Sequence, residues 1–168
     1  MSKVVVMDTS ILCCWLKVPG KETCGPLENQ WNNERVEKEI QDEMQQKATF
    51  VLPLATIIET GNHIAQANRN RFETAQAFAE ILRLTAENKT PWAAFTDQST
   101  LWDVEGLKTL ADEWPTLAAQ GLAIGDSTIK NVANYYAAMG KTVEILTGDQ
   151  LLRSYTPPKP TLIPRRRK

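Results

Sequence analysis

Four acidic residues spread along the chain stand where a predicted strand ends or a predicted helix begins. Asp8 and Asp149 each follow a predicted strand directly, Glu59 lies early in a predicted helix, and Asp126 opens another. In a parallel sheet flanked by helices, ligand sites gather beyond the carboxyl ends of the strands. The spacing therefore predicts that these four carboxylates, although far apart in the chain, meet at one edge of the sheet.

Carboxylates brought together in this way need a cation, because like charges repel and raise one another's pKa. Mg²⁺ and Mn²⁺ prefer oxygen ligands, so Asp and Glu side chains suffice when water and substrate phosphate complete the coordination shell. Such an ion can activate water and stabilise the charge that develops on a phosphodiester. These residue types therefore predict a Mg²⁺ or Mn²⁺ site made of Asp8, Glu59, Asp126 and Asp149.

The sequence has few of the residues that other kinds of catalytic or metal site need. His63 is the single histidine, which disfavours a Cys/His zinc site and a Ser-His-Asp hydrolase. The three cysteines, Cys13, Cys14 and Cys24, are odd in number and lack CxxC spacing, which indicates reduced thiols. His63 lies one helical turn after Glu59, and we interpret it as a surface residue outside the catalytic set.

Each acidic position also has a purely structural interpretation. Asp126 and Asp149 stand at predicted helix starts, where aspartate commonly caps the N-terminus. Glu59 is equally explained as a solvent-exposed side chain. Asp8 is the hardest to explain structurally, since a buried carboxylate after an apolar strand must find hydrogen-bond donors or a cation.

The elements that position these residues are short strands alternating with helices. Strands are predicted at 3–7, 49–52 and 142–146, with residues 161–163 as a further edge segment. Helices are predicted at 34–47, 54–67, 72–88, around 101–111 and at 126–139. The helix at 54–67 has an apolar side formed by Leu54, Ile57, Ile58 and Ile64, with Glu59 on another face. This alternation predicts the α/β class, with a central, mostly parallel sheet of four to five strands flanked by helices.

Composition and length favour one domain followed by a tail. The chain has 168 residues, of which 42% are hydrophobic and 23% charged, close to the averages of globular proteins. We expect a domain over 1–155 and a proline-rich basic tail over 156–168. The segment 15–33 reads as a loop long enough to indicate a functional surface.

Charge is distributed unevenly between the body and the tail. The net charge is −1 overall and −5 without the four positive charges at 165–168. Arg165, Arg166 and Arg167 are therefore expected to bind substrate phosphates, although a solvated terminus explains them as well. No apolar run approaches the roughly 20 residues of a membrane helix, and the start lacks a secretory signal. We accordingly expect a cytoplasmic protein without a membrane partner.

Four segments resemble, in order, the motifs of the PIN-domain family. The first is VVVMDTSIL at 4–12, a hydrophobic strand that ends in Asp and is followed by small hydroxyl residues. LATIIET at 54–60 is similar to the family helix that bears a glutamate. IGDS at 124–127 and ILTGD at 145–149 resemble the third and fourth acidic positions. The resemblance covers residues 3 to about 153.

The resemblance implies a PIN-like three-layer sandwich and a metal-dependent endoribonuclease, a family whose members are often the toxin of a toxin–antitoxin pair. Its implied partners are an RNA substrate, an antitoxin protein and a second copy in a homodimer. Asp8, Asp126 and Asp149 would be metal ligands directly or through water, and Glu59 a ligand or the group that orients the attacking water. Ser10 and Thr147 would belong to the substrate-binding residues, and their hydroxyls would orient these carboxylates. The long loop and the basic tail depart from a minimal toxin.

Two alternative functions share part of the pattern. Haloacid dehalogenase-type phosphatases also have a strand ending in Asp and a later Thr-Gly-Asp. That family normally has a second Asp two residues after the first, as the general acid, and this sequence has Ser10 there. A PIN-like module that binds RNA or protein without cutting is the other alternative. RNA cleavage that EDTA abolishes would separate the nuclease from both.

Overall fold

A computed structural model of the protein describes residues 2–159. The strands are β1 (Lys3–Met7), β2 (Thr49–Val51) and β3 (Thr142–Leu146). The α-helices are α1 (Thr9–Trp15), α2 (Asn33–Gln45), α3 (Leu54–Gln66), α4 (Arg71–Ala86), α5 (Val104–Ala119), α6 (Ile124–Ala138) and α7 (Gln150–Arg153). Two 3-10 helices, η1 (Leu27–Asn29) and η2 (Phe95–Trp102), lie in the connections. The predicted edge segment 161–163 and Arg165, Arg166 and Arg167 lie outside the described residues.

The sheet is parallel, and within residues 2–159 it has three strands in the order β2-β1-β3. Val5 of β1 pairs with Phe50 on one side and with Glu144 on the other, so β1 is central. Four to five strands were predicted. A fourth segment reaches the edge of β2 only through an isolated parallel bridge between Phe50 and Trp92. Pro91 lies beside this bridge and has no N–H to donate, which fits the early end of the pairing.

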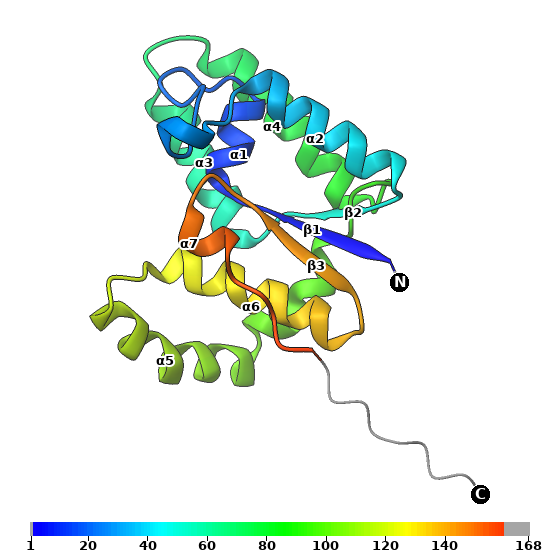
Figure 1. Ribbon diagram of the computed structural model, residues 1–168, viewed down its shortest axis with the longest axis vertical. Coiled ribbons are helices and arrows are strands. Elements are labelled where there is room, and N and C mark those ends of the chain that lie inside the picture. Colours follow the sequence, from blue (N-terminus) through cyan, green and yellow to red (C-terminus); the bar gives the residue numbers. More distant parts are fainter. Residues whose placement is uncertain (1, 160–168) are drawn as a thin grey trace, which may run out of the picture.

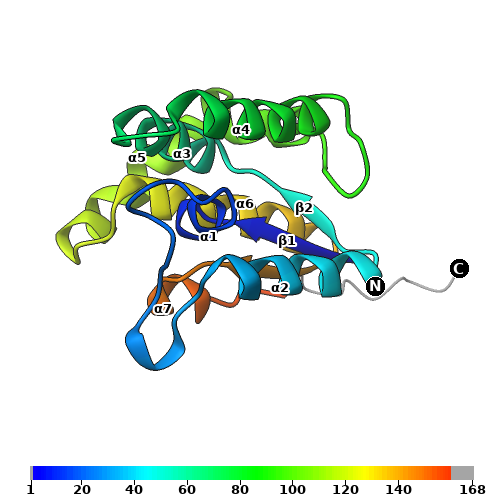
Figure 2. The ribbon, with the colours of Figure 1, turned by 90° about the horizontal axis from the view of Figure 1, so that it is seen from above.

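Helices cover both faces of the sheet, as the α/β class predicts. Side chains of β1 alternate between the faces: Val4 and Val6 pack in one core with α6, and Val5 and Met7 pack in the other core with α1 and α2. Figure 1 shows α1, α2 and α4 above the sheet and α6 below it, with α5 lying against α6. Figure 2 shows the same arrangement from above. Because both faces are buried, β1 is a continuous apolar run.

Several helices differ from their prediction in ways that matter for the site. Helix α1 starts directly after Asp8 and has no predicted counterpart. Helix α6 begins at Ile124, two residues before the predicted start, so that Asp126 lies inside its first turn. On α3 the predicted apolar side is confirmed for Ile57 and Ile64, which pack in the core, and wrong for Ile58, which is 53% exposed. The buried face of α3 is formed by Thr56, Thr60 and Ile64.

The predicted long loop is partly ordered by its own contacts. Residues Cys24 and Trp31 form an isolated antiparallel bridge around η1, and the indole of Trp31 is buried. The segment 156–159, where the tail was predicted to begin, has no helix or strand. Among the helices at 2–159, none combines the length and apolar character needed to cross a bilayer.

Candidate active site

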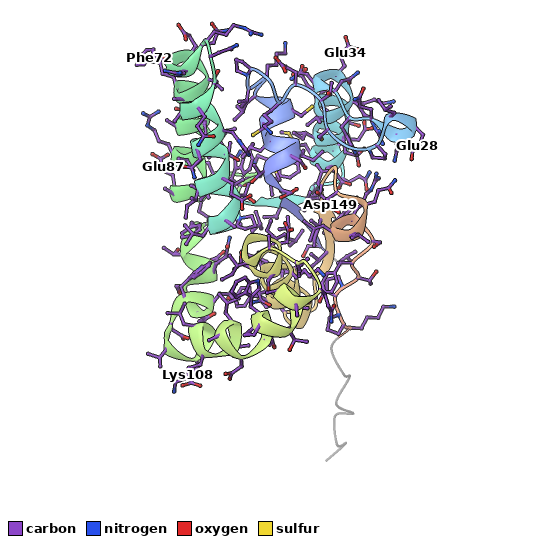
Figure 3. The ribbon with its side chains drawn as sticks, turned by 90° about the vertical axis from the view of Figure 1, so that its left-hand side faces the viewer. Glu28, Glu34, Phe72, Glu87, Lys108 and Asp149 are labelled. Atoms are coloured by element: carbon purple, nitrogen blue, oxygen red, sulfur yellow. The ribbon has the colours of Figure 1, made fainter. Side chains whose placement is uncertain are left out.

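The carboxyl ends of β1 and β3 open onto a pocket of about 360 Å³. Asp8, Glu59, Asp126 and Asp149 all line it, so the four acidic residues that the sequence singles out do come together. Figure 3 looks at the molecule from this side and labels Asp149, which lies at the start of α7. The strands and helices that supply these residues are β1, α3, α6 and the turn after β3, in agreement with the strand-end rule.

Asp8 is the most firmly held of the four carboxylates. Its side chain is 7% exposed, and its backbone N–H donates to the carbonyl of Leu146 on β3 at 3.0 Å. Its Oδ2 accepts two hydroxyl hydrogen bonds, from Thr147 Oγ1 at 2.7 Å and from Ser10 Oγ at 2.9 Å. Although Asp8 stands at the N-cap position of α1, its side chain makes no capping bond. Ser10 and Thr147 therefore contact the carboxylate as hydroxyls that orient it.

Backbone donors set the direction of these two hydroxyls. The N–H of Gly148 donates to Ser10 Oγ at 3.0 Å, and the N–H of Asp149 donates to Thr147 Oγ1 at 3.0 Å. Each hydroxyl oxygen thus accepts a hydrogen bond from the backbone and donates its own proton to Asp8. The backbone of the turn after β3 thus positions Asp8 indirectly, through the hydroxyls of Ser10 and Thr147. Both hydroxyls contact Oδ2 of Asp8, and neither contacts its Oδ1.

Glu59 reaches the pocket from α3. Its Oε2 accepts a hydrogen bond from Thr9 Oγ1 at 3.2 Å, and the helix itself is fixed to β1 because Thr56 Oγ1 donates to the carbonyl of Met7 at 2.8 Å. A threonine on the buried face of α3 therefore satisfies the last carbonyl of the strand. Gly125 of α6 faces Glu59 so closely that a Cβ added there would lie 2.5 Å from Oε1.

Asp126 is the acidic residue of the pocket whose pKa is raised. Burial raises the pKa of its carboxyl, and the charges of Asp8, Asp149 and Glu59 raise it further, while Lys130 opposes the shift. The predicted N-cap role of Asp126 is wrong, since Ala123 holds the cap position and Asp126 is the third residue of α6. A structural capping function does not explain this carboxylate.

Asp149 does cap a helix, as its structural interpretation predicts. Its Oδ1 accepts hydrogen bonds from the N–H groups of Leu151 at 2.8 Å and Leu152 at 3.2 Å, at the start of α7. These bonds use one carboxylate oxygen only. Its place on the pocket lining and its effect on the pKa of Asp126 show that the charge of Asp149 also acts on the cluster.

Sequence reasoning missed several groups on the pocket wall. Lys21, Thr23 and Cys24 come from the long loop, and His63 comes from α3 one turn after Glu59. The length of the loop was the available signal, but spacing alone does not show that it folds back over the strand ends. His63, which we interpreted as a surface residue, is half-buried and lines the pocket.

The donor set fits a hard divalent cation better than a soft one. The four acidic side chains offer oxygen atoms only, and both burial and the neighbouring carboxylates raise the pKa of Asp126. As they stand in residues 2–159, no three Asp, Glu, His or Cys side chains are grouped tightly enough to hold one ion by themselves. An ion here would accordingly keep water or take substrate oxygens in its shell, as Mg²⁺ does.

The cysteines belong to the surroundings of the pocket. All three are free thiols, with Cys13 and Cys14 buried and Cys24 half-buried. Burial raises the pKa of Cys13 to about 11 and that of Cys14 to about 12. The predicted reduced state agrees with this arrangement, and such thiols are poor metal ligands and nucleophiles.

Comparisons of this chain with protein-family models, with curated protein sequences and with solved structures find no match.

Proposed function

We propose that this chain is a PIN-like nuclease that hydrolyses RNA phosphodiester bonds with the help of Mg²⁺ or Mn²⁺. The observation that carries the proposal is the meeting of Asp8, Glu59, Asp126 and Asp149 in one pocket at the strand ends. Burial and then the charges of Asp8, Asp149 and Glu59 raise the pKa of Asp126, and a cation would offset both effects. The order of the four motifs, quoted above as a resemblance, supports the same assignment.

In this proposal the residues divide the work by their contacts. Asp8 and Asp149 each use one oxygen within the protein and would offer the other to the ion, and Asp126 would join them. Helices α3 and α6 supply Glu59 and Asp126. Glu59 is the more exposed of these two side chains, so it is suited to orient a water molecule. When bound, the ion would supply Lewis-acid stabilisation of phosphate charge and an activated water. Ser10 and Thr147 keep Asp8 in one orientation.

The test is incubation of the purified protein with mixed RNA in Mn²⁺ and in EDTA, next to an Asp8→Asn variant. We expect fragments with 5′-phosphate ends in Mn²⁺ only, and a fall of at least about 100-fold in the variant, as when one charge-stabilising group is removed from a site. Asn can still accept hydrogen bonds from Ser10 and Thr147, so the fold should survive. Asp42→Asn, an exposed position on α2, is the matched control and should cleave normally.

The non-catalytic module makes the opposite prediction. RNA that binds but is never cut, in Mg²⁺ or in Mn²⁺, would select the module. The toxin role, an antitoxin and a homodimer stay predictions from the resemblance, as does the contact of Arg165, Arg166 and Arg167 with phosphate.

A further inference from the structure

A second pocket lies beside the acidic one, across the turn that follows β3. It has a volume of about 290 Å³, and we call it the Arg153 pocket; the side chains that define it are Asn29, Trp31, Gln150, Arg153 and Ser154, with Thr147 and Gly148 at its wall. Asp149, the next residue, lines the acidic pocket. The segment 147–149 therefore lies between the two pockets.

The two pockets differ in charge. The acidic pocket contains four carboxylates, whereas the Arg153 pocket contains none, and Arg153 is its cation. In a body as acidic as this one, a nucleic acid strand is attracted to positions where a cation faces no carboxylate. A carboxylate-free pocket next to the proposed reaction centre is such a position.

Arg153 is exposed and lies against Trp31, while its polar groups stay available. Its guanidinium carbon lies 5.4 Å from the centre of the Trp31 ring, a distance suited to a cation–π contact. Within residues 2–159 the N–H groups of its guanidinium have no carboxylate partner and no hydrogen-bond acceptor. Arg35, which also lies over Trp31, at 3.8 Å, instead donates to the carbonyls of Asn29 and Gln30 and so orders the loop.

The chemistry of this pocket matches the sugar-phosphate backbone. A guanidinium donates two parallel N–H groups to one phosphate, which makes arginine a better ligand for it than lysine. The amides of Asn29 and Gln150 and the hydroxyl oxygen of Ser154 surround Arg153 and suit the ribose hydroxyl or a base edge. Small pockets of a few hundred Å³ are of the size that takes a single such group.

We propose that the Arg153 pocket binds the nucleotide next to the scissile bond of a single-stranded RNA, with Arg153 as the ligand of its phosphate. The inference rests on the proposed function, because it takes the acidic pocket as the place of cleavage. It adds a substrate-binding subsite and gives the long loop a role, since Asn29 and Trp31 come from that loop.

The first experiment measures binding without cleavage. Each variant is made in the Asp8→Asn background, and the affinity for a labelled single-stranded RNA is titrated at several salt concentrations. We expect Arg153→Ala to weaken binding about 10-fold, as one charge-assisted contact is lost. The slope of log affinity against log salt should fall by about 0.7, the share of one phosphate contact on a single strand. Arg153→Lys should keep the slope but lose affinity, because it keeps the charge without the planar fork.

The matched control is Arg83→Ala. Arg83 is an exposed arginine on α4 that pairs with Glu80 at 3.0 Å, and its removal changes the net charge by the same amount. We expect neither affinity nor slope to change in this control. Equal effects of Arg153→Ala and Arg83→Ala would show a general loss of charge and would overturn the proposal, as would RNA that does not bind at all.

The second experiment separates this proposal from the proposed function. Dinucleotides with a phosphate at the 5′ end, at the 3′ end or at neither end are offered to the otherwise unaltered protein and to Arg153→Ala. We expect one terminal phosphate to improve cleavage in the unaltered protein and Arg153→Ala to erase this difference. Cleavage that is insensitive to Arg153 overturns the subsite and leaves the nuclease standing. RNA binding that depends on Arg153 but is never followed by cleavage overturns the nuclease and leaves the Arg153 pocket as an RNA-binding site.

Discussion

A Cβ atom on Gly125 would lie 2.5 Å from Oε1 of Glu59, so the first turn of α6 is in contact with the carboxylate that α3 presents. We predict that Gly125→Ala displaces this carboxylate and lowers metal-dependent cleavage about 10-fold or more, the order of loss that follows when a positioned group is misplaced by an ångström. The free energy of unfolding should not fall, because the clash meets the end of a flexible side chain and alanine is the better helix former. Cleavage rates and chemical denaturation measure the two effects separately.

Gly61→Ala is the control for this prediction. Gly61 lies inside α3, and an added Cβ there has no atom within 4 Å. It should gain about 0.5–1 kcal/mol of stability, as glycine-to-alanine changes in helices do, with unchanged cleavage. If Gly125→Ala behaves like Gly61→Ala in both measurements, the position of Glu59 does not matter for the reaction.

Thr147→Val removes the shorter of the two hydrogen bonds on Asp8 while keeping the shape of the side chain. We expect metal affinity or cleavage to fall about 10–100-fold, the usual effect of losing a group that orients a ligand. Some stability, about 1–3 kcal/mol, should be lost too, because the N–H of Asp149 loses its acceptor. Isothermal titration with Mn²⁺ and thermal unfolding measure these quantities.

Thr147→Ser retains the hydroxyl and serves as the conservative counterpart. It should restore metal affinity and most of the activity, although the methyl group is lost from a fully buried position. Equal losses in the serine and valine variants would assign Thr147 to packing alone.

Asp126→Asn should stabilise the protein when no metal is present. The pKa of Asp126 is raised in the fold by burial and by Asp8, Asp149 and Glu59, so the folded state binds its proton more tightly than the unfolded state does. Above that raised pKa the ionised carboxylate therefore destabilises the fold, and stability is lost as the pH rises through it. We expect a rise in Tm of about 2 °C or less at neutral pH in EDTA, because solvent screens the charge of this partly buried group.

The same variant should lose cleavage and gain no further stability from Mn²⁺, whereas the unaltered protein should gain stability when the ion is added. Stability of both proteins at low pH should be nearly equal, since Asp126 is then protonated. Asp112→Asn, at an exposed position on α5, is the control and should leave Tm and cleavage unchanged. A lower Tm for Asp126→Asn in EDTA would argue against a repulsive cluster.

The cysteines should differ sharply in reactivity. Cys13 and Cys14 are buried and their pKa values are raised to about 11 and about 12, so the thiolate that reacts with iodoacetamide is scarce near pH 8. Cys24 is half-buried on the pocket wall and should be alkylated first. Peptide mass spectrometry after brief labelling should find the modification on Cys24, and on the other two only after unfolding. Rapid labelling of Cys14 in the folded protein would contradict this account.

Much of the fold follows from local patterns in the sequence. The valine run at the start predicts β1, and the spacing of Val36 and Ile40 predicts α2. The number of strands does not follow so directly, because pairing at the edge of β2 depends on Trp92, which is 42 positions after its partner Phe50, and on the proline before it. Helix α1 was missed, since nothing in its short apolar run separates a buried helix from a strand.

The sequence by itself determined which side chains can meet: the ends of parallel strands lie at one edge of the sheet, which brings Asp8 and Asp149 together. Glu59 and Asp126 lie on helices that begin at the same edge, so the sequence predicts all four around one pocket. Only the tertiary structure decided how each is held, because the deciding contacts join residues far apart in the chain. Thr147 bonds Asp8 across 139 positions, and Asp126 lies inside its helix instead of capping it. The same is true of Arg153, whose availability depends on where a distant loop places Trp31.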